Sequence, residues 1–375
     1  MSETNNETDN VMQLLQSSQL ESIELGLVLA DLLQIDTTKF KEDIEIAFSL
    51  ISDNQEILIS EKIWKVKTQK RLNLSGYNLT FIPPPIKYFT DITSLYAEKN
   101  QLTYLPAEFG SLTKLETLYA PTNQLTTLPP EIGHLKYLYH IDLQNNQLTS
   151  IPLQIIDCTN LTKLWLEDNL LSTFPEEVSK LNNLEVLNLG KNLLREIPIG
   201  ITQIIQLKEL HLHHNLLAVI LKELFNLTNL ITLSLDQNQI NYIPTDIGKL
   251  TQLVTLHIDR NLIGSIPAEI GLLKRLETLD INSNQLTSLP LQIGKLTNLK
   301  HLAVDNNYLH SIPSSIGNLK SLTVFYLQAN HLTSLPPEIA NLTNLSFLSL
   351  EDNPISNSEK EKIKTWLPNC KINFE

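Results

Sequence analysis

Apolar residues recur along most of the chain at fixed offsets around an asparagine that returns every 23 residues. In one repeat, residues 138–143 alternate between apolar and polar side chains, which indicates a strand with Ile141 and Leu143 facing inward and Asp142 facing outward. Because a single repeat cannot bury its own apolar side chains, this pattern predicts a stack of repeats with one strand in each. The asparagines that keep the period are Asn100, Asn123, Asn146, Asn169, Asn192, Asn215, Asn238, Asn261, Asn284, Asn307, Asn330 and Asn353.

The segment between successive strands is short. Each strand has the same direction, so the strands are expected to be parallel. The asparagine amide has one acceptor and two donors, and it is expected to bond the buried turn backbone of its own and adjacent repeats. A proline follows in most repeats and leaves about ten residues for the return, which favours short 3-10 turns over full α-helices. Leu221 replaces this proline, so residues 218–225 are predicted to form a helical turn, and Tyr77 replaces the asparagine of the first repeat.

Residues 276–296 follow the form LxxLxLxxNxLxxLPxxIGxL almost without deviation. This form resembles the 23-residue class of the leucine-rich-repeat superfamily, which includes Ras-group leucine-rich-repeat scaffolds and many bacterial proteins. The resemblance implies an α/β fold, a curved right-handed solenoid with a concave parallel sheet of about 13 strands and short 3-10 segments on the convex side. It also implies protein binding on the concave sheet, without specifying a partner.

The ends of the solenoid are expected to be covered. We predict a disordered acidic tail over 1–10, a helical N-terminal cap over 11–68, the solenoid over 69–353 and a C-terminal cap over 354–375. Ser358 and Glu361 form a capping-box pattern before Ile363, and Ile372 with Phe374 predicts a last short strand. The helices expected in the N-terminal cap are residues 11–15, 20–33 and 40–51, the last of them after a cap at Thr37 or Thr38.

Charge and composition narrow the class of protein. The net charge is −13, and residues 1–60 hold twelve acidic and two basic side chains, so they carry −10 of it. An acidic chain disfavours nucleic acid, and the basic stretch 61–71 is expected to pair with the acidic arm. Without a long apolar run or a signal peptide, we expect no membrane contact and a cytoplasmic location. Cys158 occupies a core position, and the two cysteines give no disulfide framework or zinc spacing.

Binding residues are expected in two outward-facing ladders, four and two residues before each asparagine. Exposed aromatic residues there are candidate anchors for a protein partner, with charged neighbours as a polar rim, although stacking between adjacent strands explains them without any ligand. The candidate partner-binding residues are Tyr96, Tyr119, Asp142, Lys163, Trp165, Glu167, His211, His213, Asp236, His257, Asp259 and Tyr326.

The histidines among these candidates allow three interpretations. Imidazoles at i and i+2 on a strand, with a third ligand across the sheet, can hold zinc or nickel, and the candidate ligands are His211, His213, Asp236 and His257. However, His211 and His257 are two strands apart, about 9.6 Å, so we expect no metal. The other interpretations are a pH-sensitive partner site and a solvated polar face whose carboxylates raise the histidine pKa modestly.

An apolar stripe is expected just after the asparagines, at Leu170, Leu193 and Leu216. It is either a partner or dimer contact or a set of ordinary exposed leucines.

Phosphate loops, HExxH and GxSxG are absent from the sequence, so we expect no enzymatic activity, no cofactor and no small-molecule substrate. The leading hypothesis is a protein-interaction scaffold that serves in signalling. The alternatives are a metal-dependent or pH-gated binder and a secreted effector without a cleavable signal.

Overall fold

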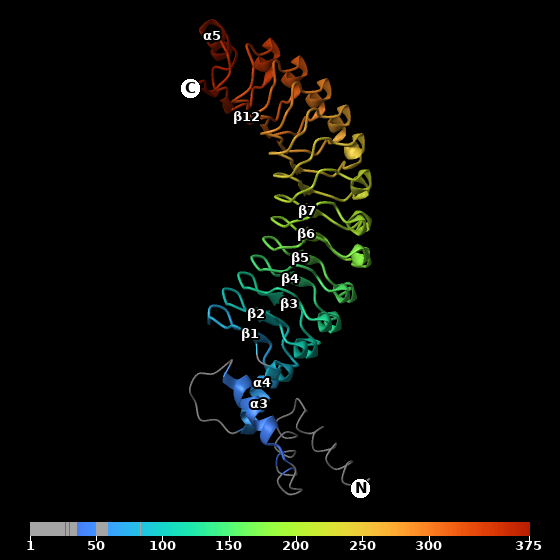
Figure 1. The fold of residues 1–375 in the computed structure, drawn as a ribbon. Helices are drawn as coiled ribbons and strands as arrows, with labels where there is room; N and C mark the ends of the chain where they lie inside the picture. The colour runs from blue at the N-terminus through green and yellow to red at the C-terminus, as the bar shows by residue number, and fades with distance from the viewer. Residues whose placement is uncertain (1–26, 28–29, 31–35, 50–58, 83) are drawn as a thin grey trace. The chain divides into compact units, whose positions relative to one another are not determined.

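The computed structural model describes residues 27, 30, 36–49, 59–82 and 84–375 (Figure 1). These residues belong to two compact units, Met1–Leu164 and Trp165–Glu375. The predicted acidic tail and the predicted helices over 11–15 and 20–33 lie outside the described residues, apart from residues 27 and 30.

Each repeat contributes one strand of three residues. In the first unit β1 to β4 pair in parallel, and in the second unit β6 to β14 do the same. Residues at equivalent positions of successive repeats are partners. The strands are β1 (Arg71–Asn73), β2 (Ser94–Tyr96), β3 (Thr117–Tyr119), β4 (His140–Asp142), β5 (Lys163–Trp165), β6 (Val186–Asn188), β7 (Glu209–His211), β8 (Thr232–Ser234), β9 (Thr255–His257), β10 (Thr278–Asp280), β11 (His301–Ala303), β12 (Val324–Tyr326), β13 (Phe347–Ser349) and β14 (Lys371–Asn373). The prediction of parallel strands is confirmed.

The return segments are 3-10 helices of five residues, as expected from the short connections. They lie on the side opposite the strands, which is the outer side of the bend in the second unit (Figure 1). Their bounds are η1 (Pro84–Tyr88), η2 (Ala107–Ser111), η3 (Pro130–His134), η4 (Leu153–Asp157), η5 (Glu176–Lys180), η6 (Ile199–Gln203), η7 (Lys222–Asn226), η8 (Thr245–Lys249), η9 (Ala268–Leu272), η10 (Leu291–Lys295), η11 (Ser314–Asn318) and η12 (Pro337–Asn341). The leucine-rich-repeat solenoid predicted from the sequence is therefore confirmed within each unit.

The repeat without its proline behaves like the others. Leu221 has φ −64° and ψ 131°, close to the backbone angles of the prolines at this position, and the helix that follows is the ordinary five-residue η7. The helical turn predicted over 218–225 is therefore wrong. Stacking against the neighbouring 3-10 helices determines the conformation here, and proline is not needed to impose it.

The asparagine ladder forms as predicted. Asn215 is 6% exposed, and its Nδ2 donates to the carbonyls of Leu189, Leu212 and His213 at 2.9, 3.1 and 3.2 Å. Its Oδ1 accepts from the backbone N–H of Leu194 at 2.9 Å. Each amide thus bonds the turn of its own repeat and that of the preceding repeat, so the buried turns have partners for their polar groups.

The residue before each ladder asparagine adopts a left-handed conformation, which the sequence analysis did not anticipate. These residues have φ between 49° and 58°, although β-branched and charged side chains occur among them. The set is Lys99, Thr122, Asn145, Asp168, Lys191, His214, Gln237, Arg260, Ser283, Asn306, Ala329 and Asp352.

The described part of the N-terminal region contains two α-helices, α3 (Thr38–Ser49) and α4 (Ile59–Thr68). Helix α3 matches the helix predicted over 40–51, and the Asp36 carboxylate accepts from the Thr38 backbone N–H at 2.9 Å. Helix α4, which carries most of the basic stretch, was not predicted from the sequence. Lys67 in this helix is 2% exposed, and burial lowers its pKa to about 8, so it does not contribute to a basic surface patch.

At the other end, α5 (Asn357–Trp366) and β14 follow the last repeat. The capping side chain is Ser356, whose Oγ accepts from the Glu359 N–H at 3.3 Å, so the predicted capping box at Ser358 and Glu361 is two residues too late. The short strand predicted around Ile372 is confirmed, because β14 pairs with β13.

None of the helices in the described part of the chain is long and apolar enough to cross a lipid bilayer.

Cys158 is buried, and its thiol donates to the Ile132 carbonyl at 3.2 Å. Burial raises its pKa to about 12, so this residue is an unreactive part of the core, as the sequence indicated.

Candidate functional site

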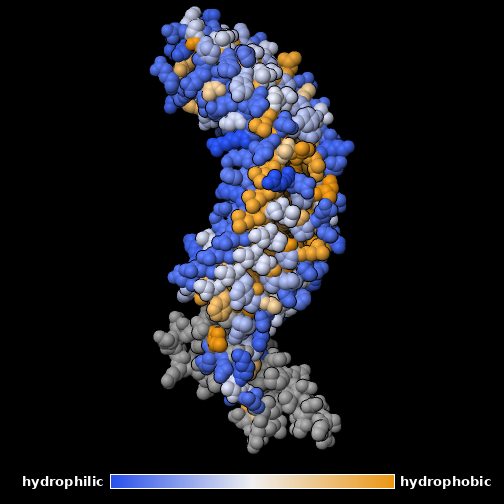
Figure 2. Space-filling model, in the orientation of Figure 1, coloured by the Kyte–Doolittle hydropathy of each residue, from blue (hydrophilic) through white to orange (hydrophobic). Residues whose placement is uncertain are grey.

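Most strands bury the middle residue and leave the flanking residues partly accessible, although β6 is buried at all three positions. In β7, for example, Leu210 is fully buried while Glu209 and His211 remain partly accessible. This alternation makes the strand side the surface on which side chains are not committed to the core, and Figure 2 shows hydrophilic residues along the strand-side edge of the second unit.

In the first unit, two predicted anchors lie together. The rings of Tyr96 and Tyr119 are 6.0 Å apart and inclined by 55°. Burial, followed by the charges of Asp142 and Glu98, raises the pKa of Tyr119. Asp142 is only 6% exposed and its carboxylate accepts from the Gln144 backbone N–H at 3.1 Å, so it is not the exposed rim residue that was predicted. Lys163 is exposed at the end of this unit.

In the second unit, Trp165 lies against a histidine. Its ring and that of His211 are stacked at 6.4 Å with an interplanar angle of 22°. His211 Nδ1 lies 3.2 Å from Ser234 Oγ, and its Nε2 lies 3.6 Å from Glu209 Oε2. His213 meets His211 edge-on, with 6.4 Å between ring centroids. These contacts hold the indole and both imidazoles in a fixed group.

Glu167 links this group to its polar surroundings. Its Oε1 lies 2.8 Å from Lys191 Nζ and 3.4 Å from His213 Nε2, and its Oε2 accepts from Asn188 Nδ2 at 3.0 Å. Burial favours the neutral acid, but the contacts with Lys191, Asn188 and His213 outweigh it and the pKa of Glu167 is lowered. We call Trp165, Glu167, His211 and His213 the tryptophan platform.

Gly190 leaves the space in which the His213 ring lies. A Cβ on this residue would lie 2.2 Å from Cε1 of His213, so only glycine leaves room for the imidazole at its present place. It is the only glycine in the ladder two residues before the asparagines, so the sequence itself marks this position as different from the others. Lys191 was also missed, because it lies outside both ladders.

The pKa of His211 is shifted opposite to the expectation. Burial lowers it below its ordinary value of 6.5, and this effect exceeds the opposing effect of Glu209. The prediction that neighbouring carboxylates raise the histidine pKa is therefore wrong for His211, because the stacked indole and the sheet exclude water from the charged form.

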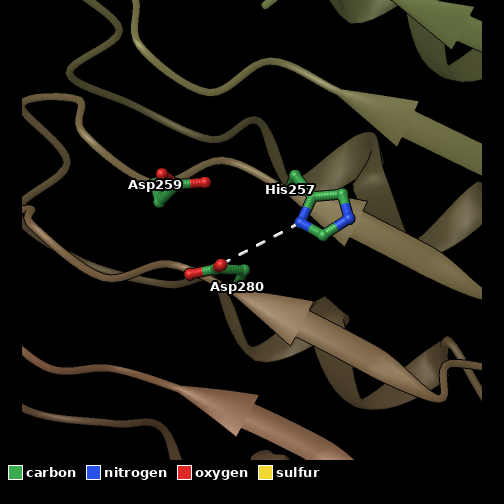
Figure 3. A group of neighbouring side chains, drawn as sticks. All are labelled: His257, Asp259 and Asp280. Carbon is green, nitrogen blue, oxygen red and sulfur yellow. Dashed lines mark ion pairs between the residues drawn. The ribbon is translucent and has the colours of Figure 1, made fainter. Parts of the chain in front are cut away.

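A second group lies further along the same strand face (Figure 3). His257, Asp259 and Asp280 each offer a donor atom, and these atoms all lie within 4.8 Å of one another. Of the four metal candidates taken from the sequence, only His257 belongs to this group. His211 and His213 belong to the tryptophan platform. Asp280, which pairs with His257 at the end of β10, was not among the candidates.

The carboxylates of this region are poorly compensated. Burial, then Asp280 and Asp236, raise the pKa of Asp259 to about 7. Burial also raises the pKa of Asp280 and of Asp305. The nearest cation recorded for Asp259 is Arg260, whose Nε is 4.0 Å from Asp259 Oδ2.

Two further candidates lie elsewhere on the second unit. Tyr326 is 38% exposed and its ring is 5.5 Å from that of Phe347. In the leucine stripe, Leu170 and Leu193 are 46% and 44% exposed and Leu216 is half-buried, and Leu262 continues the position two repeats later with 47% exposure.

Comparisons with known proteins agree with this geometry. Family models described as "Leucine-rich repeat region" and "Leucine rich repeat" match residues 260–362 and 205–263. A solved leucine-rich-repeat protein of Leptospira interrogans is 36% identical, with 84% of this chain and 86% of that one covered and a TM-score of 0.74. The chain belongs to the leucine-rich-repeat family.

Other solved leucine-rich-repeat proteins are similar over most of the chain. The internalin inlF of Listeria monocytogenes is 25% identical, with 90% of this chain and 94% of that one covered and a TM-score of 0.75. The plant peptide hormone receptor RGFR1, solved in complex with RGF2, is 31% identical with a TM-score of 0.70; 78% of this chain and 49% of the receptor are covered. No curated protein sequence matches. Proteins of this family are generally non-enzymatic scaffolds for protein interactions.

Proposed function

We propose that this leucine-rich-repeat protein binds a protein or peptide on the strand face of its second unit, with the tryptophan platform as the main contact. The observation that carries the proposal is the stacked pair of Trp165 and His211, at 6.4 Å, on the face that the backbone leaves accessible. Tryptophan buries a large area with little loss of conformational entropy, and such residues dominate the binding energy of protein interfaces.

The structure around Trp165 supports this role. Contacts with Glu209, Ser234 and Glu167 keep the two imidazoles in place before any partner arrives. A surface that is already ordered loses less entropy on binding than a mobile one. Neighbour stacking along the ladder would order Trp165 as well. It does not account for the glycine at position 190, where a Cβ would meet the His213 ring, or for the contact of Glu167 with His213 at 3.4 Å.

The chemistry of the partner follows from the charge of this face. Glu167, Asp236, Asp259 and Asp280 are partly buried acidic residues on the strand side, where Asp305 is buried. We therefore infer a basic, extended segment as the preferred partner, since complementary charge speeds association and excludes acidic competitors. The peptide complex of the similar plant receptor supports this mode of binding without identifying the ligand.

A site-specific photo-crosslinker tests the proposal. The reactive side chain is placed at Glu209 in β7, at the edge of the platform, and separately at Lys222 in η7 of the same repeat, on the opposite side of the solenoid. Both variants are expressed in the native host, irradiated, and the adducts are identified by mass spectrometry.

We expect a defined protein adduct from the Glu209 position and none from the Lys222 position. An adduct only from Lys222 places binding on the 3-10 side and contradicts the proposal. Absence of adducts from both positions also contradicts it.

A further inference from the structure

A mixed set of metal-ligating side chains lies on β9, β10 and the turn after β9. His257 and Asp280 occupy paired positions of neighbouring strands, and Asp259 follows His257 by two residues, so all three side chains project to the same face (Figure 3). Among the described residues this is the set of three such groups whose donor atoms approach within 4.8 Å. We propose that His257, Asp259 and Asp280 bind one divalent transition-metal ion, Zn²⁺ above all.

The backbone already holds the ligands near the required spacing. A tetrahedral zinc ion with bonds of about 2.1 Å separates its ligand atoms by roughly 3.4 Å. The donor atoms lie within 4.8 Å of one another, so they must converge by at most about 1.4 Å. The side chains of His257 and Asp280 are 37% and 27% exposed, which leaves them room to rotate and gives an ion access from solvent. The strand register need not change.

One ligand is oriented by its own neighbour. Asp280 Oδ1 accepts from the backbone N–H of Asn282 at 3.3 Å and from Asn282 Nδ2 at 2.7 Å. Its other oxygen, Oδ2, lies 4.0 Å from His257 Nδ1. Hydrogen bonds of this kind fix the orientation of metal-binding carboxylates, and they leave Oδ2 available to an ion.

Charge in the surroundings favours a cation. Asp236 adds a third carboxylate whose charge acts on both Asp259 and Asp280. Asp259 forms one ion pair among the described residues, with Arg260 at 4.0 Å. The Arg260 side chain is 64% exposed and therefore screened by water. A divalent ion between the carboxylates replaces their mutual repulsion by attraction.

The ligand types select the class of metal. Imidazole nitrogen is a good ligand for zinc, nickel and cobalt, whereas calcium and magnesium prefer a shell of oxygen atoms. Three protein ligands leave at least one coordination position for water or for a group of a bound molecule. The tryptophan platform shares none of these residues, whereas Asp259 and Asp280 also belong to the acidic face of the proposed partner site. Metal titration in the absence of any partner therefore tests the inference separately.

The test is calorimetric titration of the full-length protein with ZnCl₂, and separately with CaCl₂, beside three variants. His257→Ala and Asp280→Ala each remove one ligand, and His211→Ala removes one of the two histidines of the tryptophan platform as a matched control. Visible absorption of the Co²⁺ form serves as a second measurement, because it reports ligand number and geometry directly.

We expect one equivalent of Zn²⁺ to bind to the wild type and to His211→Ala with equal affinity. His257→Ala and Asp280→Ala should each weaken binding about tenfold or more, and lose the Co²⁺ spectrum of the wild type. The inference is overturned if the wild type binds no zinc, if it binds Ca²⁺ in preference, or if His211→Ala rather than His257→Ala abolishes binding.

Discussion

The residue before each ladder asparagine has a conformation that its side chain disfavours. For residues other than glycine, a left-handed conformation is unfavourable by about 1–2 kcal/mol. The repeat accepts this strain because the turn must direct the following asparagine inward. Sequence patterns show the asparagine, but not the strained residue before it, because lysine, threonine and alanine all occur at that position.

Replacement of Ala329 by glycine should therefore stabilise the protein. Ala329 has φ 50°, so glycine relieves the strain, and its greater flexibility when unfolded offsets part of the gain. We expect the free energy of unfolding to rise by about 0.5–1 kcal/mol. Ala340→Gly in η12, where the backbone is helical, is the matched control and should lower the stability. If urea unfolding showed the same change in the free energy of unfolding for both variants, the backbone at Ala329 would not be strained.

His211 makes the stability of the protein depend on pH. Burial lowers its folded-state pKa below 6.5, so near that pH the unfolded state binds more protons than the folded state. The neutral His211 ring therefore makes its full contribution to the free energy of unfolding above pH 6.5, and this contribution is lost as the pH falls below that value. We expect a titration midpoint below 6.5 for the His211 ring by NMR, and a smaller loss of stability on acidification in His211→Gln. A midpoint at or above 6.5 would show that Glu209 outweighs burial.

Within the 3-10 helices, contact between neighbouring repeats determines which residues are tolerated. A Cβ on Gly200 in η6 would lie 1.7 Å from the carbonyl oxygen of Glu176, which is backbone and cannot move aside. A Cβ on Gly264, in contrast, would meet nothing within 4 Å.

These two glycines give opposite predictions for the same substitution. Gly200→Ala forces η5 and η6 apart and should destabilise the protein by about 3 kcal/mol or more. Gly264→Ala should stabilise it by about 0.4–1 kcal/mol, since alanine restricts the unfolded chain. Thermal unfolding of the two variants beside the wild type measures both effects. If Gly200→Ala melted with the wild type, the close approach of η5 and η6 would be wrong.

Most of the fold could be predicted because the 23-residue period is local information repeated twelve times. The strands, the buried asparagines and the short 3-10 helices all follow from apolar spacing. The errors occurred where the repeat deviates or ends: residues 218–225 formed the ordinary η7, α4 was missed, and the capping serine is Ser356. At the last of these sites the same Ser-x-x-Glu pattern occurs at Ser356 and Glu359 as at Ser358 and Glu361, so the local pattern did not distinguish the two caps.

The site was predicted less completely. The ladders correctly identified which residues face outward, but they assigned Asp142 to the rim although it is buried. They also did not show that His257 groups with Asp259 and Asp280, while His211 groups with Trp165. Side-chain rotamers make these choices, and residues such as Gly190 and Lys191 contribute through contacts between repeats.

At the scale of the whole molecule, stability is expected to depend on interactions between adjacent repeats. Neighbouring asparagines share acceptors: Nδ2 of Asn215 and Nδ2 of Asn238 both donate to the Leu212 carbonyl, at 3.1 and 3.0 Å. Asn330 donates to the carbonyls of Val304, Leu327 and Gln328, so it shares no acceptor with Asn215.

A double-mutant cycle separates local from distant coupling. Each asparagine-to-alanine change should cost about 1–3 kcal/mol. The pair Asn215→Ala and Asn238→Ala should cost more than the sum, because only the double variant removes both amide donors from Leu212. The pair Asn215→Ala and Asn330→Ala should be additive within about 0.5 kcal/mol. Additivity in the first pair would show that the shared carbonyl contributes nothing.

The central claim is that a partner binds on the strand face of the second unit. The affinity of the crosslinked partner for a Trp165→Ala variant tests this claim most directly. Isothermal titration should show binding weakened about 30-fold or more, the loss of roughly 2 kcal/mol typical of a central interface residue. Leu291→Ala, at an exposed position on η10, should bind like the wild type. Unchanged affinity in Trp165→Ala, or a loss confined to Leu291→Ala, would contradict the claim.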